Sequence, residues 1–269
     1  MRGLGMVGRW MPTPLTKASA VIHLGAAAAL VRPGAWPWAV GAVAADHLLL
    51  VACGLVPRST LLGPNLTRLP DAAAGQGYIA VTVDDGPEPE VTPRVLALLD
   101  EYGAKATFFC IGERVAQHPD LVREIARRGH SVENHSAQHR HDFSLLGPRR
   151  ISHEIERAQD TIASIVGTQP LFFRAPAGLR NPFLQPVLAR LGLRLASWTR
   201  RGFDTVERDP GTVLAKLERN LRAGDILLLH DGHAAATRGG TPVILEVLPR
   251  LLATVRAARL SPVTLRAAV

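Results

Sequence analysis

The chain has 269 residues, of which 47% are hydrophobic and 20% are charged, with a formal net charge of +8 and two cysteines. The apolar fraction suffices for a core and excludes a disordered chain, while two cysteines are too few for a secreted scaffold held together by disulfides. The charge leaves nucleic acid, an anionic membrane surface and an anionic substrate as partners to be weighed.

Two apolar stretches, residues 18–31 and 35–56, lie within the first sixty residues, with an Arg-Pro-Gly turn signal at 32–34 between them. A helix needs about 20 apolar residues to span a bilayer, so the second stretch is long enough and the first is short. The pattern fits a helical hairpin that dips into or spans the membrane, a signal peptide followed by mature protein, or a buried pair of helices in a soluble domain.

Polar and aromatic residues bear differently on these three interpretations. The second apolar stretch directly follows the first, which weakens the signal-peptide interpretation. Asp46 and His47 favour the soluble pair because they are costly in lipid, whereas Trp36 and Trp38 suit a membrane interface. We predict an apolar helical hairpin that associates with the membrane surface or spans the membrane as transmembrane helices.

Basic residues near the hairpin predict its orientation. They are Arg2, Arg9 and Lys17 before the first stretch, Arg32 between the two, and Arg58 and Arg68 after the second. By the positive-inside rule, this distribution favours a hairpin in the inner cell membrane with both ends cytoplasmic, while a single span would place the remainder outside. A Pro-, Gly- and Ala-containing segment then marks a boundary. We therefore expect a membrane-associated segment at 1–60, a linker at 61–77 and a second domain at 78–269.

Short β-rich runs alternate with helical patterns from residue 78 onward. The expected strands are 78–83, 107–111, 131–134, 171–173, 194–198, 226–229 and 262–265, and the expected helices are 92–102, 121–128, 148–166, 183–190, 210–221 and 242–258. This alternation indicates an α/β domain with a parallel sheet, and six or seven such units favour a TIM-like barrel over an open sheet.

A polar cluster follows five of the expected strands. The clusters contain Asp84 and Asp85, His135 and His139, Arg174, Asp204, and His230. Because the carboxyl ends of parallel strands face the same way in β/α folds, the five clusters converge at one mouth. Each cluster alone is weak evidence, but their joint occurrence after successive strands predicts an active site.

The residue types in these clusters suit metal-assisted hydrolysis. His135 and His139, four residues apart, can reach one metal ion from a helical turn, and Asp84 or Asp85 can complete a set of two His and one carboxylate. Adjacent residues leaving a strand point in opposite directions, so one Asp can ligate the metal while the other accepts a proton from bound water. His, His and Asp suit several divalent metals, so the residues alone leave zinc, cobalt, nickel and manganese open.

Two further groups complete the predicted chemistry. His230 can protonate a leaving group. Arg174 can hold the base carboxylate ionised and oriented through a bidentate contact. His233, close behind His230, stays ambiguous and could line the rim of the site.

Four motifs in this order resemble those of a known family. They are Thr82-Val83-Asp84-Asp85-Gly86, His135-Ser136-Ala137-Gln138-His139, Arg174-Ala175-Pro176-Ala177-Gly178 and Leu227-Leu228-Leu229-His230. They resemble the T-F-D-D-G, H-[ST]-x-x-H, R-x-P-[YW]-G and L-x-L-H motifs of the NodB-homology polysaccharide deacetylases, carbohydrate esterase family 4. The resemblance covers residues 78–265. It implies a distorted (β/α)7 barrel, a divalent metal that is often zinc, and hydrolysis of an N-acetyl group from an amino sugar.

The resemblance also implies a role for individual residues. Asp84 would be the catalytic base, Asp85, His135 and His139 the metal ligands, Arg174 the residue that positions the base, and His230 the general acid. The backbone N–H near Ala177 would help to hold the oxyanion, and Leu228 would form part of the pocket for the acyl methyl. Asp204 would orient Arg174 or tune His230.

The chain departs from the family pattern at three positions. Ala177 replaces the aromatic of the R-x-P-[YW]-G motif, Thr205 replaces the Trp of a further family motif that ends in an Asp-Trp pair, and Val83 replaces a Phe. The metal set and the acid and base remain. The departures therefore bear on sugar specificity more than on hydrolysis.

We expect the domain at 78–269 to be a catalytic barrel that removes an N-acyl group from an amino sugar, polymeric or lipid-linked, during envelope glycan assembly. The alternative is a catalytically impaired, membrane-tethered glycan-binding protein on the same barrel, suggested by the lost aromatics. No long Lys/Arg run with interleaved aromatics is present, so we expect no nucleic-acid partner, and we infer no obligate protein partner.

Overall fold

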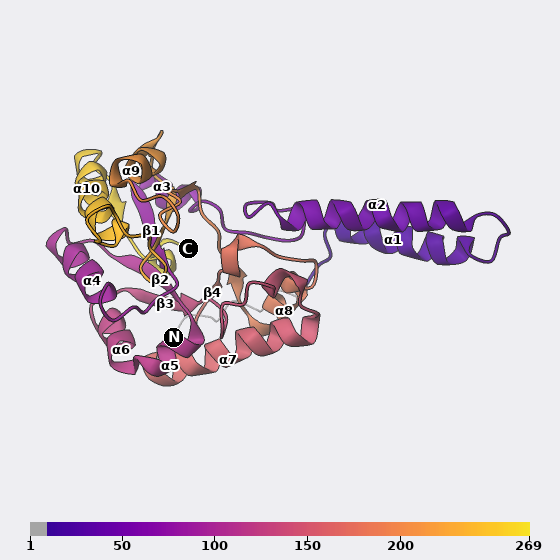
Figure 1. Cartoon of the computed structure of the whole chain (residues 1–269), viewed down its shortest axis with the longest axis horizontal. Coiled ribbons are helices and arrows are strands. Elements are labelled where there is room, and N and C mark those ends of the chain that lie inside the picture. The colour runs from indigo at the N-terminus through magenta and orange to yellow at the C-terminus, as the bar shows by residue number, and fades with distance from the viewer. Residues whose placement is uncertain (1–9) are drawn as a thin grey trace.

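The N-terminal part of the computed structural model is a pair of apolar helices. The structure describes residues 10–269, so Arg2 and Arg9, used above to predict orientation, lie outside it. Helix α1 (Pro14–Ala29) and helix α2 (Trp36–Gly54) lie side by side and project from the remainder of the molecule (Figure 1). Among the described helices, α2 is the one long and apolar enough to cross a membrane, by length and composition.

Residues 78–262 contribute a curled sheet of eight parallel strands. The strands are β1 (Tyr78–Asp84), β2 (Ala106–Cys110), β3 (Ser131–Asn134), β4 (Phe172–Phe173), β5 (Arg194–Leu195), β6 (Arg200–Arg201), β7 (Ile226–His230) and β8 (Ser261–Pro262). Their order is β5-β4-β3-β2-β1-β7-β6, and β8 pairs with the beginning of β1. The predicted distorted (β/α)7 barrel is confirmed, with β5 and β6 at the two edges of a half-barrel.

Helices cover the outside of the sheet (Figure 1). They are α4 (Thr92–Glu101), α5 (Gly112–Gln117), α6 (Pro119–Arg127), α7 (Pro148–Val166), α8 (Leu184–Leu191), α9 (Pro210–Glu218) and α10 (Val243–Ala257), with short helices α3 (Asp71–Gly75) and α11 (Leu265–Ala268). Proline lies in the first turn of α4, α6, α7 and α9, where its missing N–H is tolerated and its fixed φ favours helix initiation.

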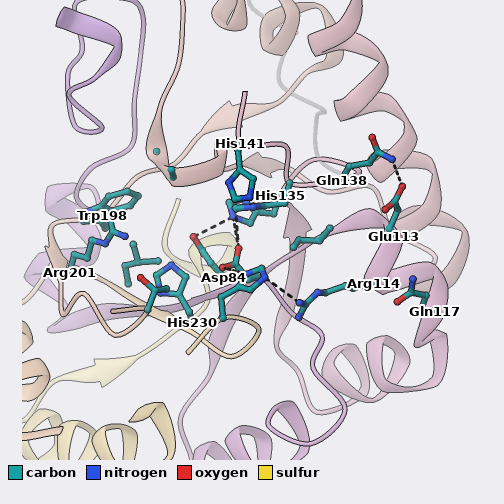
Figure 2. A pocket seen from close by; sticks show the side chains of 18 residues that line it. Asp84, Glu113, Arg114, Gln117, His135, Gln138, His141, Trp198, Arg201 and His230 are labelled. Atoms are coloured by element: carbon teal, nitrogen blue, oxygen red, sulfur yellow. Dashed lines mark hydrogen bonds and ion pairs between the residues drawn. The ribbon is translucent and has the colours of Figure 1, made fainter. Parts of the chain in front are cut away.

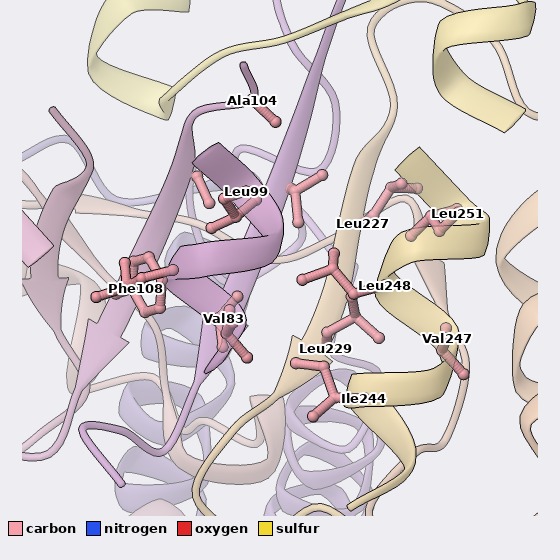
Figure 3. Packing of buried hydrophobic residues seen from close by; sticks show 14 of the residues in the cluster. Val83, Leu99, Ala104, Phe108, Leu227, Leu229, Ile244, Val247, Leu248 and Leu251 are labelled. Carbon is pink, nitrogen blue, oxygen red and sulfur yellow. The ribbon is translucent and has the colours of Figure 1, made fainter. Parts of the chain in front are cut away.

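Alternation along the central strands separates an apolar outer face from the barrel interior. Val83 of β1 and Leu227 and Leu229 of β7 face outward and pack in the same cluster as Ile244 and Leu248 of α10 (Figure 3). The intervening residues point into the barrel because successive strand residues face opposite sides. Asp84 and His230 thereby face the interior at the carboxyl ends of adjacent strands, where they are register partners.

The lower part of the barrel interior is closed by apolar side chains. Phe109, Phe172 and Leu228 form a cluster there with Leu265 of α11 and Leu69 from the segment before β1. This filling leaves the polar groups at the carboxyl end of the sheet as the accessible interior surface.

Several short elements differ from the sequence prediction. The strand expected at 194–198 ends at Leu195, because Ala196 makes an isolated bridge to Leu66, and β6 follows as a separate edge strand. The strand expected at 262–265 occupies Ser261–Pro262 instead, and α11 begins at Leu265. Helices α3, α5 and α11 were not predicted because four to six residues show little periodicity.

The three-part division of the chain stays a prediction. Within the expected linker, α3 forms and Leu69 packs into the barrel interior. Hydrogen bonds connect the end of α2 and the residues after it to the barrel: the Arg180 N–H donates to the Gly54 carbonyl at 3.2 Å, and the Ser197 hydroxyl donates to the Pro57 carbonyl at 2.7 Å. The end of the hairpin thus touches the barrel near its mouth.

Candidate active site

A pocket of about 580 Å³ opens at the carboxyl ends of the strands (Figure 2). Seven of the nine predicted site residues line it: Asp84, Asp85, His135, His139, Ala177, Leu228 and His230. The other two, Arg174 and Asp204, are buried directly behind Asp84 and His230. The five clusters that follow separate strands in the sequence therefore meet at one place.

Asp85, His135 and His139 form a compact set of potential metal ligands. Their ligand atoms lie within 4.8 Å of one another. Each of the two histidine Nε2 atoms is 3.2 Å from Oδ1 of Asp85. Two imidazoles and one carboxylate with an accessible side are the donors that several divalent transition metals prefer.

The hydrogen bonds around this set fit a bound cation. Nδ1 of His135 lies 2.8 Å from the Arg174 carbonyl oxygen, so Nδ1 carries a proton, and in the neutral ring that a metal binds, the Nε2 lone pair points toward Asp85. Oδ1 of Asp85 is buried and has no hydrogen-bond partner within residues 10–269. A cation would satisfy this oxygen and both imidazole nitrogens.

The protonation states of Asp85 and His139 also favour metal binding. Although burial opposes ionisation, the imidazoles of His135 and His233 hold the pKa of the Asp85 carboxyl well below its ordinary value. Burial, together with the neighbouring His135, lowers the pKa of His139 to about 4. Asp85 is therefore ionised and His139 neutral at neutral pH, as metal ligands must be.

The backbone at this set differs from the prediction. Asp85 has a left-handed φ of 73°, which breaks strand alternation, so Asp84 and Asp85 both face the pocket rather than opposite directions. His135 and His139 lie on a loop instead of a helical turn, because Ser136 and His139 also have positive φ. The Asn134 side chain accepts the Ser136 N–H and the Ser136 hydroxyl accepts the His139 N–H, which hold this loop.

Arg174 anchors the second carboxylate. Its guanidinium donates to Asp84 Oδ1 at 2.6 Å, to the Thr82 hydroxyl at 2.8 Å and to the backbone carbonyls of Ser197 and Ala196. The contact with Asp84 involves a single oxygen, so the predicted bidentate geometry is wrong. The other guanidinium N–H groups donate to the two backbone carbonyls instead, and these bonds fix the guanidinium in the barrel wall.

Asp204 acts on His230 and makes no hydrogen bond to Arg174. Oδ1 of Asp204 lies 2.9 Å from Nδ1 of His230, and Oδ2 accepts the His230 backbone N–H at 2.7 Å. Burial opposes the imidazolium, but the charge of Asp204, with those of Asp84 and Asp85, raises the pKa of His230 to about 9. His230 is therefore protonated at neutral pH and can donate a proton.

Trp198 provides an aromatic wall beside the third motif. Ala177 is exposed and left-handed, with φ of 54°, and offers only a methyl group. The neighbouring Gly178 contacts Trp198 so closely that a Cβ there would lie 2.6 Å from its ring. The pocket therefore keeps an aromatic surface next to Ala177, supplied by the β5–β6 segment.

His233, Arg114 and Arg201 also line the pocket. Nδ1 of His233 is 2.9 Å from Asp85 Oδ2, which places it against the metal-ligand set rather than only at the rim. The three-residue spacing from His230 was the one sequence signal for it. Nothing in the sequence distinguished Arg201 from the other scattered arginines.

Fold and pocket together are those of a β/α barrel with two buried ion pairs beside a possible metal site. A family model described as "Polysaccharide deacetylase" matches residues 71–196. A peptidoglycan-N-acetylglucosamine deacetylase of Bacillus cereus is 35% identical over 156 residues, which cover 57% of this chain and 72% of the relative. The chain belongs to the polysaccharide deacetylase family, as the motif resemblance implied.

Two further relatives agree. A chitooligosaccharide deacetylase of Azorhizobium caulinodans is 35% identical over 158 residues, covering 58% of this chain and 75% of the relative. The structure of a family 4 carbohydrate esterase from Streptomyces lividans matches with a TM-score of 0.63 and 33% identity, covering 69% of this chain and 91% of that chain. Family membership supports a hydrolase that acts on N-acetyl groups.

Replacing Asp204 by Asn should lower the pKa of His230 below its value of about 9, because the main stabilising charge is removed. Since the folded-state pKa exceeds the unfolded value, this pair stabilises the fold fully below pH ~6.5 and loses its effect as pH rises through about 9. NMR titration of the His230 ring in metal-free protein measures the shift, with Asp160→Asn on α7 as control. An unchanged His230 pKa in Asp204→Asn would contradict the assignment.

Proposed function

We propose that this protein is a metal-dependent deacetylase that hydrolyses the N-acetyl group of an amino sugar. One observation carries the proposal: a carboxylate held by Arg174 and an imidazolium held by Asp204 flank the Asp85–His135–His139 set in one pocket. The relatives of known activity, which act on N-acetylglucosamine glycans and chitooligosaccharides, support the substrate class.

Asp85, His135 and His139 would hold the metal. When bound there, a divalent cation lowers the pKa of water and polarises the acyl carbonyl oxygen. The donor set favours zinc, with cobalt, nickel or manganese as alternatives. The backbone near Ala177 would supply a further donor to the oxyanion.

Asp84 and His230 would divide the proton transfers. Oδ2 of Asp84 lies 3.9 Å from His135 Nε2, so this carboxylate borders the metal set and accepts a proton from the attacking water. As the C–N bond breaks, His230 donates a proton to the leaving amine. Leu228, buried below the pocket mouth, would contact the acyl methyl.

Asp84→Asn should keep the metal but lower kcat at least about 100-fold, because the amide cannot accept the water proton. His135→Ala should lose metal and activity together. Release of free amine from an N-acetylated glucosamine oligosaccharide, with metal content measured on the same samples, tests both variants against Asp160→Asn. Full activity in both Asp84→Asn and His135→Ala would disprove this mechanism.

We further propose that the substrate is lipid-linked. The hairpin would tether the barrel to the membrane. The residues that directly follow α2 lie beside the pocket: Pro57 packs against Gly178, and the Arg58 guanidinium donates to the Thr199 carbonyl at 3.0 Å. The pocket wall that includes Trp198 therefore lies on the hairpin side. A sugar carried on a membrane lipid would enter the pocket from this side. A polymer far from the membrane would not benefit from a pocket held close to the lipid.

Arg201 suits the phosphate of such a substrate. It lines the pocket beside Trp198 (Figure 2), with its guanidinium 5.6 Å from the Trp198 ring centre. Its Nε is buried without a hydrogen-bond partner within the described chain, whereas Arg114 across the pocket pairs with Glu88 at 3.1 Å. A guanidinium without a carboxylate partner in a substrate pocket is a site for an anionic group.

Arg201→Gln should raise KM for a lipid-linked N-acetyl sugar phosphate about tenfold or more, since a charged hydrogen bond is lost. The effect on a neutral chitooligosaccharide should be much smaller. Steady-state kinetics on the two substrates measure the difference, and Arg150→Gln on α7 is the matched control. Equal effects on both substrates would contradict phosphate recognition by Arg201.

The barrel would lie on the cytoplasmic side of the inner membrane, as the basic residues that flank the hairpin favour. A C-terminal fusion to a reporter enzyme that is active only outside the cytoplasm should be inactive, while a cytoplasmic fluorescent reporter should be bright. The opposite pattern would place the barrel in the periplasm, with a polymeric envelope glycan as substrate.

The alternative is a catalytically impaired glycan-binding protein on the same barrel. Ala177 and Thr205 motivate it, because both replace aromatic residues of the family pattern. Trp198 beside Ala177 weakens this motive. Absence of turnover by the metal-loaded wild type on both lipid-linked and polymeric N-acetyl sugars would favour the alternative.

A further inference from the structure

The hairpin contains a polar cluster that the proposed reaction does not use. His23 and Ser19 come from α1, and Asp46 and His47 come from α2. Asp46 is only 4% exposed although it lies on an apolar helix. Ionisable groups in such a setting are costly unless a partner satisfies them, so we asked which partner this cluster could bind.

His23 directs a nitrogen lone pair across the hairpin. Its Nδ1 lies 2.9 Å from the Ser19 carbonyl oxygen, which only an N–H can satisfy, so in the neutral ring the lone pair is on Nε2. Nε2 of His23 is 3.1 Å from Nε2 of His47 on the other helix. Two nitrogens bound to one zinc ion at about 2.0–2.1 Å in a tetrahedron lie roughly 3.3 Å apart.

Asp46 supplies a carboxylate at the same place. Its Oδ2 accepts the Ser19 hydroxyl at 2.7 Å, which fixes the carboxylate inside the hairpin. Ligand atoms of His23, Asp46 and His47 all lie within 4.8 Å of one another. The barrel mouth holds the same donor set, with His135 likewise bonded through Nδ1 to a backbone carbonyl.

We propose that His23, Asp46 and His47 form a second metal site, for a divalent transition metal of the zinc class. The ligands come from both helices, so binding favours the closed hairpin over separated helices by mass action. His47 is exposed, so the ligand set is open on one side of the hairpin. The ion also offsets the charge of Asp46 within an apolar hairpin, which a direct His23–His47 hydrogen bond does not.

The experiment uses the full-length chain in detergent micelles, stripped of metal and titrated with Co²⁺ and then Zn²⁺. His135→Ala/His139→Ala removes the barrel set, so the cobalt spectrum and the metal content of this double variant report the hairpin alone. We expect one tightly bound ion per chain, and a drop to zero when His23→Gln and His47→Gln are added. His153→Gln, an exposed position on α7, is the matched control.

His47→Gln alone guards against unfolding, because His47 is exposed and its replacement leaves the hairpin packing intact. It should weaken Co²⁺ binding to the hairpin at least about tenfold while the helix content by circular dichroism is unchanged. Two results would overturn the proposal: the His135→Ala/His139→Ala variant binds no ion, or it binds an ion with an affinity that His47→Gln does not change. The His23–His47 contact would then be a metal-free hydrogen bond. Neither result depends on deacetylase activity.

Discussion

The arrangement of the site depends on one buried cation, the guanidinium of Arg174. It is 1% exposed, and a charge in such a place is tolerated only when its donors are paired. Arg174 meets this condition with the Asp84 carboxylate, the Thr82 hydroxyl and two carbonyls of the segment after β5. Its own carbonyl fixes the ring of His135. One residue thereby joins β1, β4, the pocket wall and the metal-ligand set, so these parts cannot be displaced independently.

Acid and base groups occupy the same pocket because each is matched with an opposite charge. Asp84 faces the permanent cation of Arg174, and His230 faces the buried carboxylate of Asp204. Register pairing places Asp84 and His230 at the ends of adjacent strands. Without their partners, a base and an acid so close together would exchange a proton and lose their separate functions. The Arg174 ion pair fixes the Asp84 carboxylate in place, and the charge of Asp204 helps to raise the pKa of His230 to about 9, so that this imidazole is protonated at neutral pH.

Much of this could be predicted from strand periodicity and the order of polar clusters. Period-two alternation places Asp84 and His230 inside the barrel, and parallel strands bring the clusters to one mouth. The local turns could not be predicted: Asp85 and His139 have positive φ, and although Asp and His adopt positive φ more often than most residues, this preference does not show at which positions it occurs. The partner of Asp204 was undecided because the path of the chain between β6 and α9 has no periodic signal. The two-residue edge strand β6 carries too little pattern to be recognised, whereas β5 was expected within a longer run.

The side-chain positions in the hairpin alter the argument about a membrane location. In the sequence, Asp46 and His47 count against a membrane location because a charged group in lipid is costly. In the structure, Asp46 points between the helices and accepts a hydrogen bond from Ser19, so no carboxylate faces outward there. The part of that cost due to Asp46 is thus met within the hairpin itself, whereas His47 remains exposed. Since Pro57 and Arg58 connect the end of α2 to the Trp198–Thr199 wall, a membrane around the hairpin would lie next to the pocket that holds Arg201. The excess positive charge is then useful where it meets lipid phosphate, and nucleic acid is not needed to explain it.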